Sequence, residues 1–214
     1  MDSRLRFLST IVLLTVGCST LAQQSPSRPV RVVLGFPAGG PTDAAGRIVG
    51  QALSARIGQP VVIDNRPGAD GAIGPELVAK ATPDGHTLLL GSASNLAGVP
   101  AMRKQVPYDT MADFAAVTFV NWSSLLLVIH PGVPTFSIFG WSALMAPAKT
   151  PATVISYLDR EVNAVLKMPD VQDQFGKIGF ETGGPSRQEF PAFLGEQLKS
   201  WAAAAARDAG MQPQ

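Results

Sequence analysis

The chain has 214 residues, of which 46% are hydrophobic and 15% are charged, and its formal net charge is +1. This length supports one well-developed hydrophobic core or two smaller ones. The charges are balanced, without a basic stripe or an acidic tail, so nucleic acid is not expected as a partner.

The first residues have the layout of a secretory signal. Two arginines precede an apolar run over residues 7–16, which is shorter than the roughly 20 apolar residues that a membrane-spanning helix needs. Small residues ending in Leu-Ala-Gln follow. We therefore expect residues 1–22 to be a signal peptide and residues 23–214 to form the mature chain, located in the periplasm.

Lipid attachment at Cys18 is the alternative to cleavage after Ala22. Residues 15–18 loosely resemble a lipoprotein cleavage box, but Thr15 stands where that box favours leucine, so we favour simple cleavage. Cys18 is the only cysteine. If it leaves with the signal, the mature chain has no disulfide, no thiolate metal site and no cysteine nucleophile.

The first half of the mature chain predicts alternating strands and helices. Apolar runs indicate strands, helical spacing of apolar residues indicates a helix from Thr42, and Gly58 stands where that helix should end. The expected strands cover residues 30–36, 60–65 and 87–92, with helices over 42–57 and 73–81. This order is typical of a parallel sheet with right-handed crossovers.

The second half has a different pattern. Residues 115–120 and 123–130 are extended candidates, and a further apolar segment covers 136–147. Three helices are expected after it. The first begins at Thr150-Pro151, the second at Pro169, and the third after a capping box made by Ser186 and Glu189.

The stretch GFPAGGPT, residues 35–42, lies between the first strand and its helix, where α/β proteins bind anions. It resembles a phosphate-binding loop, but Pro41 occupies the lysine position, so the main charge partner of a triphosphate is missing. The dinucleotide pattern also fails, because Gly35 is followed by Phe36 and Pro37. Neither nucleotide class is expected.

The same loop remains suited to a carboxylate. Gly39 and Gly40 let backbone N–H groups converge, and the helix adds its positive end. Thr42 and Asp43 are placed to cap the helix or to bind a hydroxyl or ammonium group of a ligand. A plain strand-to-helix turn explains the motif equally well.

A second candidate loop, residues 91–95, follows the third strand. In a parallel sheet its carboxyl end lies on the same side as the first loop, where ligands of open α/β sheets bind. Ser92, Ser94 and Asn95 offer neutral donors and acceptors. A serine-rich loop without a binding role is the simpler alternative.

Catalytic and metal-binding patterns are absent from the sequence. His86 and His130 have no serine and acid partners at a recognisable spacing, and we expect both to be structural. The aspartates lie mostly in predicted turns, which favour this residue for its own backbone bonds. We expect a binding protein with no cofactor, and not an enzyme.

Several blocks of the sequence together resemble the Bug-type, or TctC-like, periplasmic receptors of the tripartite tricarboxylate transporters. They include RPVRVVLGFPAGGPTD, GQPVVIDNRPGADGAIG, VAKATPDGHTLLLGSAS, VPYDTMADFAAVTFV and WSALMAPAKTPATVISYLDREVNAVLKMPDVQDQF. The resemblance implies a two-lobed α/β receptor that closes around a dicarboxylate, a tricarboxylate or an acidic amino acid and delivers it to membrane permease subunits.

The resemblance also implies where the ligand is held. The loop over residues 36–43 would bind a ligand carboxylate through backbone N–H groups and ordered water, and the loop over 91–95 would add side-chain contacts. The implied ligand-binding residues are Phe36, Ala38, Gly39, Gly40, Thr42, Asp43, Ser92, Ser94 and Asn95.

The chain departs from the family at Thr135. Family members pass from a segment like LLLVIHPGVP into a second lobe and return through one like FSIFGWSALMAP, whereas here only Thr135 separates the two. We expect one α/β lobe with a mainly parallel sheet flanked by helices, made of residues 28–134 and a returning part, 136–214. The second lobe is largely missing, and a hairpin is expected at the junction.

Loss of the second lobe has consequences for binding. A half-site open to water should bind its ligand weakly, because burial strengthens the hydrogen bonds of a carboxylate. Phe136, Phe139 and Trp141 are candidates for an apolar patch on the face left bare, which would favour self-association or a protein partner. The alternative function is therefore a non-transporting remnant or a protein-interaction lobe.

Overall fold

The computed structural model describes residues 26–127 and 136–207. These residues form a six-stranded sheet with the order β2-β1-β3-β5-β4-β6. The strands are β1 (Val30–Leu34), β2 (Val61–Asn65), β3 (Thr87–Ser92), β4 (Phe114–Leu127), β5 (Phe136–Pro147) and β6 (Phe180–Thr182). The predicted signal peptide, with Cys18, lies outside the described residues, and so do His130, Thr135 and Gly210.

The predicted parallel arrangement of the first three strands is confirmed. β1 pairs parallel with both β2 and β3, while β5 pairs antiparallel with β3 and with β4, and β6 pairs antiparallel with β4. Four strands, β1 to β4, therefore run in one direction. The sheet is nevertheless mixed, because β5 and β6 run in the opposite direction and every pairing that involves one of them is antiparallel.

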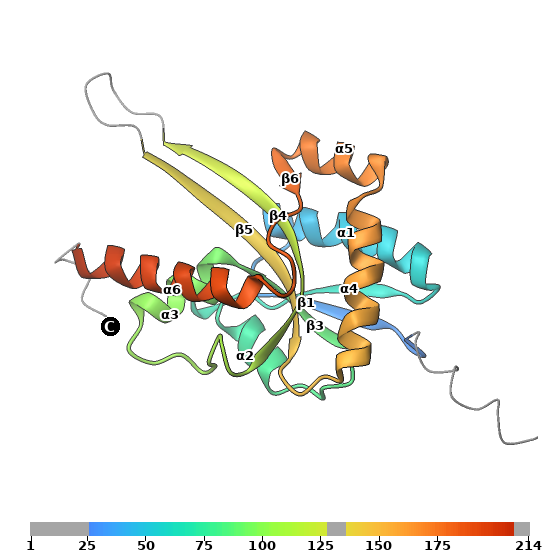
Figure 1. The fold of residues 1–214 in the computed structure, drawn as a ribbon, viewed down its shortest axis with the longest axis horizontal. Helices are drawn as coiled ribbons and strands as arrows, with labels where there is room; N and C mark the ends of the chain where they lie inside the picture. The colour runs from blue at the N-terminus through green and yellow to red at the C-terminus, as the bar shows by residue number, and fades with distance from the viewer. Residues whose placement is uncertain (1–25, 128–135, 208–214) are drawn as a thin grey trace, which may run out of the picture.

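Helices cover both faces of the sheet (Figure 1). On one face lie α1 (Pro41–Ile57), α4 (Ala152–Leu166) and α5 (Pro169–Lys177), and on the other α2 (Ile73–Ala79), α3 (Val99–Met102) and α6 (Phe190–Arg207). Along β1, Val32 and Leu34 belong to the first layer of the core and Val33 to the second. A strand buried on both sides needs the continuous apolar run that this segment has.

Local signals in the sequence set the helix boundaries. Pro41 begins α1, where its missing N–H costs nothing, and Gly58 ends the helix in the left-handed conformation at φ 69°. The predicted capping box before α6 is confirmed. The N–H of Ser186 donates to Glu189 Oε2 at 2.9 Å, and the N–H of Glu189 donates to Ser186 Oγ at 3.3 Å.

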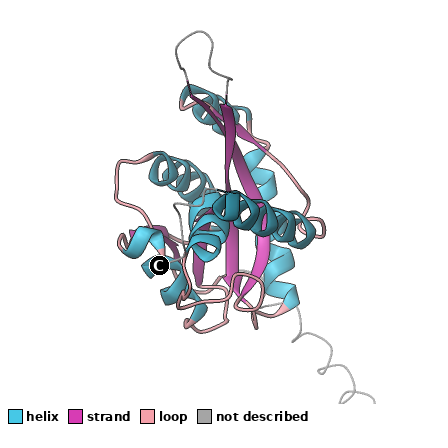
Figure 2. Cartoon of the chain, turned by 90° about the vertical axis from the view of Figure 1, so that its left-hand side faces the viewer, coloured by secondary structure: helices cyan, strands magenta, loops and turns pink. Residues whose placement is uncertain are grey.

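The two extended segments expected at 115–120 and 123–130 form a single strand, β4, as far as Leu127, where the described part ends. It pairs with β5 from Phe114↔Pro147 to Leu127↔Phe136, so the predicted hairpin is present, with its connection outside the described residues. Figure 2 shows these two strands running beyond the rest of the sheet.

The prediction that Trp141 belongs to an exposed patch is wrong. The residue is 2% exposed, its ring lies 5.6 Å from that of Phe190 and 5.4 Å from that of Phe193, and its Nε1 donates to Gln197 Oε1 at 3.2 Å. These partners come from α6, which returns to cover this face of the sheet. The side chains of Phe136 and Phe139 lie outside what the structure describes.

Candidate functional site

The two predicted loops meet at one edge of the sheet, which we call the rim: the carboxyl ends of β1, β2 and β3 and the loops that follow them. A Cβ added to Gly35 would lie 3.1 Å from Asn95 Nδ2 and 2.3 Å from the carbonyl oxygen of Gly71. The loop after β2 therefore lies against the other two. Sequence reasoning did not include this third loop in the site.

The loop after β1 opens directly into α1. Gly39 has φ 84°, a conformation that favours glycine, and Gly40 is the N-cap in an extended conformation without a side-chain cap. The N–H of Ala44 donates to the carbonyl oxygen of Gly40 at 3.0 Å. The N–H groups of Thr42 and Asp43 lie in the first turn, where a helix supplies no acceptor of its own. These N–H groups form the positive end of the 17-residue helix α1 at the rim.

Asp43 serves the loop itself. Its Oδ2 accepts the N–H of Gly39 at 2.9 Å and the Nε of Arg47 at 2.8 Å, while its Oδ1 is buried without a hydrogen-bond partner. The hydrogen bond from Arg47 holds the pKa of Asp43 below its usual value against the opposing effect of burial. Asp43 is therefore ionised at neutral pH, and it uses one of the N–H donors expected to bind the ligand.

Asn95 also has an internal role. It is fully buried, its Oδ1 accepts the N–H of Ser92 at 2.8 Å, and the hydroxyl of Tyr108 donates to its backbone carbonyl. Burial raises the pKa of Tyr108 to about 12, so this hydroxyl keeps its proton at neutral pH. Asn95 thus fixes the turn after β3, which is a short helical segment (Ser94–Gly98) and not the open loop that was expected.

The remaining predicted residues differ in exposure. Ala38, Gly39 and Ser94 are exposed, whereas Phe36, Gly40, Thr42 and Ser92 are half-buried. The carbonyl oxygen of Phe36 accepts Asn65 Nδ2 at 3.1 Å, which ties the first loop to the end of β2. Among the nine predicted residues, Asp43 and Asn95 are the two whose side chains are buried and engaged within the protein.

A row of polar residues crosses the sheet next to the rim, and sequence reasoning missed it. Ser92 on β3 pairs with Ser142 on β5, Ser142 pairs with Asn121 on β4, and Asn121 pairs with Thr182 on β6. Directly paired residues point to the same face of a sheet. Asn121 is 1% exposed and its Oδ1 has no hydrogen-bond partner. The sequence does contain a signal for this row, because Asn121 and Ser142 interrupt the otherwise apolar segments that form β4 and β5.

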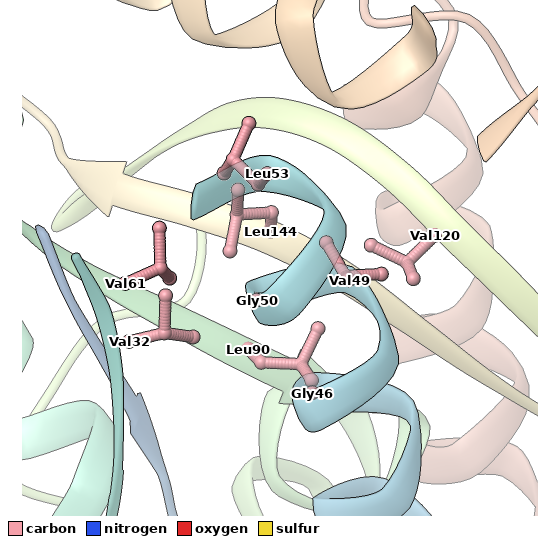
Figure 3. A pocket seen from close by; sticks show the side chains of 9 residues that line it. All are labelled: Val32, Gly46, Val49, Gly50, Leu53, Val61, Leu90, Val120 and Leu144. Atoms are coloured by element: carbon pink, nitrogen blue, oxygen red, sulfur yellow. The ribbon is translucent and has the colours of Figure 1, made fainter. Parts of the chain in front are cut away.

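A small cavity lies away from the rim, between α1 and the sheet (Figure 3). Its volume is about 10 Å³, enough for one water molecule, and apolar side chains line it. The lining residues are Val32, Gly46, Val49, Gly50, Leu53, Val61, Leu90, Val120 and Leu144. None of them belongs to the predicted site, so this cavity is a packing defect of the core.

Residues 26–127 and 136–207 contain neither a candidate metal cluster nor a candidate membrane-spanning helix. No three or more histidine, cysteine, aspartate or glutamate side chains of this part gather as a metal site would require. Nor does any helix described there combine the length and apolar character needed to cross a bilayer.

Known proteins with similar sequences are transport receptors and their relatives. The profile of the tripartite tricarboxylate transporter family receptors (TctC) matches residues 45–139. The chain is 38% identical over 134 residues to a UPF0065 protein and 37% identical over 150 residues to protein BugT, both of Bordetella pertussis. These matches cover 62% and 69% of this chain but 41% and 45% of the relatives, so the chain spans less than half of their length.

Solved structures show the same fold. The periplasmic binding protein BugD superposes with a TM-score of 0.77 at 20% identity, and the alignment covers 88% of this chain and 100% of BugD. MatC of Rhodopseudomonas palustris, with bound malate, gives 0.74 at 20% identity over 83% and 99%. A second R. palustris protein, with adipate, gives 0.77 at 20% identity over 88% and 99%.

Proposed function

Because the chain belongs to the tripartite tricarboxylate transporter receptor family, as a shortened member, we propose that it is an extracytoplasmic receptor for a small carboxylate. The observation that supports this proposal is the first turn of α1, which follows β1 at the rim, the edge of the sheet where β3 also ends with Ser92. Two related folds hold malate and adipate, which are both dicarboxylates. Delivery to permease subunits and a periplasmic location are part of the same proposal.

The donors that remain for the ligand are neutral. Asp43 uses the N–H of Gly39, and Pro37 and Pro41 have none, so the ligand carboxylate is left with the N–H groups of Ala38, Gly40 and the first turn of α1. The hydroxyls of Thr42 and Ser92 add two side-chain donors. Neutral donors at a helix N-terminus bind anions through fixed dipoles, without a charged partner.

We propose that residues 23–214 form one lobe and that the part without a counterpart in this chain is the second lobe. The hairpin of β4 and β5 would then stand where the chain of a two-lobed receptor crosses between lobes. A ligand on this lobe stays open to water on one side, so its affinity should lie in roughly the millimolar range, where stabilisation appears only at high ligand concentration.

A second candidate function is that of a non-transporting remnant or a protein-interaction lobe. The observation in its favour is the hairpin, whose described strands extend beyond the rest of the sheet. This candidate predicts a stably folded protein that is indifferent to carboxylates. The two functions therefore differ in a direct binding experiment.

The test is a thermal-shift titration of the purified protein against dicarboxylates, tricarboxylates and acidic amino acids. The Gly40→Asp variant places a carboxylate where the ligand carboxylate would bind. A Cβ at Gly40 meets only the carbonyl oxygen of Pro37, at 3.7 Å, and aspartate is a good N-cap, so the variant should fold. Gly176→Asp is the matched control, because a Cβ at Gly176 has no neighbour within 4 Å.

A carboxylate that raises the melting temperature of the wild type and of Gly176→Asp, but not of Gly40→Asp, supports the receptor. A cooperative melt that no ligand moves in any of the three proteins contradicts it and favours the second candidate.

A further inference from the structure

Both strands of the β4–β5 hairpin extend past the ends of their outer neighbours, β3 and β6. On β5 the last pairing with β3 is Ser142↔Ser92, and on β4 the pairing with β6 ends at Ser123↔Phe180. Within the described residues, Phe136–Trp141 and Ser124–Leu127 therefore pair only with strands of the hairpin itself. In Figure 1 the far end of the hairpin stands clear of the helices, whereas Trp141 at its base packs against α6.

The sequence of the hairpin lacks charge. No aspartate, glutamate, lysine or arginine occurs from Phe114 to Ala148, although 15% of the whole chain is charged. Charged side chains on edge strands are the usual protection against pairing with another chain. The outer strands of the sheet have that protection: β2 carries Asp64, which contacts Arg31 and Arg66, and β6 carries Glu181.

A ribbon of two strands also leaves half of its backbone groups without a ladder partner. Such ribbons are at best marginally stable in water, and they gain stability from a third strand or from a covering element. On β5, six residues pair with β4 but with no described strand on their other side. On β4, four residues pair with β5 but with no described strand on their other side. The β5 edge is therefore the longer template for a further strand.

We propose that the β5 edge, Phe136–Trp141, pairs antiparallel with the same edge of a second copy of this chain. A two-fold axis makes one edge complementary to itself, since antiparallel pairing exchanges identical N–H and C=O groups. The absence of charge removes the repulsion that self-pairing of a charged edge would meet. The second copy then covers the part of the ribbon that projects from the sheet. This interface does not depend on carboxylate binding.

The first experiment measures mass against protein concentration by analytical ultracentrifugation. The wild type should form a concentration-dependent dimer. Ile138→Lys places a lysine on the β5 edge of both copies and should raise the dissociation constant roughly tenfold, because like charges on paired strands repel. Val62→Lys is the control, since Val62 is 51% exposed on the outer strand β2. It should leave the dimer unchanged.

The second experiment places single cysteines at Ser137, Ile138 and Phe139 in turn, each in a chain that also carries Cys18→Ser. Oxidation should link two chains for at least one of them and should not do so for Val62→Cys, because only residues near a two-fold axis meet their own copies. Circular dichroism spectra must show that each variant is folded. A wild type that remains monomeric at every concentration overturns the proposal. So does a dimer that neither Ile138→Lys nor the cysteines affect.

Discussion

The carboxylate of Asp43 accepts the backbone N–H of Gly39 at 2.9 Å, so the chain holds its own anion inside the loop that was predicted to hold a ligand anion. Arg47 binds the same oxygen from the next turn of α1. Asp43 is 3% exposed, so its carboxylate faces the protein and positions the loop. The proposed receptor function would leave ligand binding to the backbone and to the hydroxyls around it.

Replacement of Asp43 by alanine should destabilise the protein by about 1–3 kcal/mol, since it removes a buried acceptor and leaves the N–H of Gly39 unpaired. Asp43→Asn keeps an oxygen for that N–H and should cost less. Arg47→Ala is the comparison and should cost less than Asp43→Ala, because Arg47 is exposed and the N–H of Gly39 keeps its acceptor. Urea unfolding measures all three. Equal losses for Asp43→Ala and Arg47→Ala would contradict the positioning role.

The Asp43 interaction should weaken in acid. Its pKa in the folded protein lies below the ordinary 3.8, so its contribution to the free energy of unfolding is fully present above pH 3.8. That contribution is lost as the pH falls through the lower folded value. The difference in unfolding free energy between wild type and Asp43→Asn should therefore shrink on acidification. A difference that stays constant down to the acid transition would show that the charge of Asp43 does not matter.

Asn95→Ala should destabilise the protein and also remove any response to carboxylates. The change leaves the N–H of Ser92 without its acceptor in a buried site, at a cost of about 1–3 kcal/mol. Ser94→Ala is the matched control, because Ser94 is exposed and one residue away. Thermal melts with and without ligand measure both effects. If Ser94→Ala is as damaging as Asn95→Ala, the buried amide is not what holds this turn.

Gly35→Ala tests how tightly the loops of the rim pack. A Cβ at this position would lie 2.3 Å from the carbonyl oxygen of Gly71, a backbone atom that can move only with its whole loop. We expect a loss of about 1–3 kcal/mol from overpacking. Gly176→Ala in α5 has open space for its Cβ and should gain about 0.5–1 kcal/mol from helix propensity. A neutral Gly35→Ala would mean that the loops are not in close contact.

The local pattern of the sequence determined most of the fold around the rim. Runs of apolar residues near 30–36 and 87–92, the helical spacing after Thr42 and the glycine at position 58 each act within one or two turns of chain. The capping box before α6 is local in the same sense. These elements could be predicted because their stabilising contacts lie among neighbouring residues.

Only the tertiary structure decided what the polar residues and the returning strand do. Asp43 and Asn95 were predicted to face a ligand, but both side chains are buried and accept hydrogen bonds from backbone N–H groups of the protein. The sequence places Trp141 in an apolar run that was predicted to be exposed, but α6 covers this residue in the folded chain. The position of β5 between β3 and β4, which aligns Ser142 with Ser92 and Asn121, follows from pairings between residues far apart in the chain. Contacts of that kind leave no periodic trace in a sequence, because their partners are chosen only when the chain is packed.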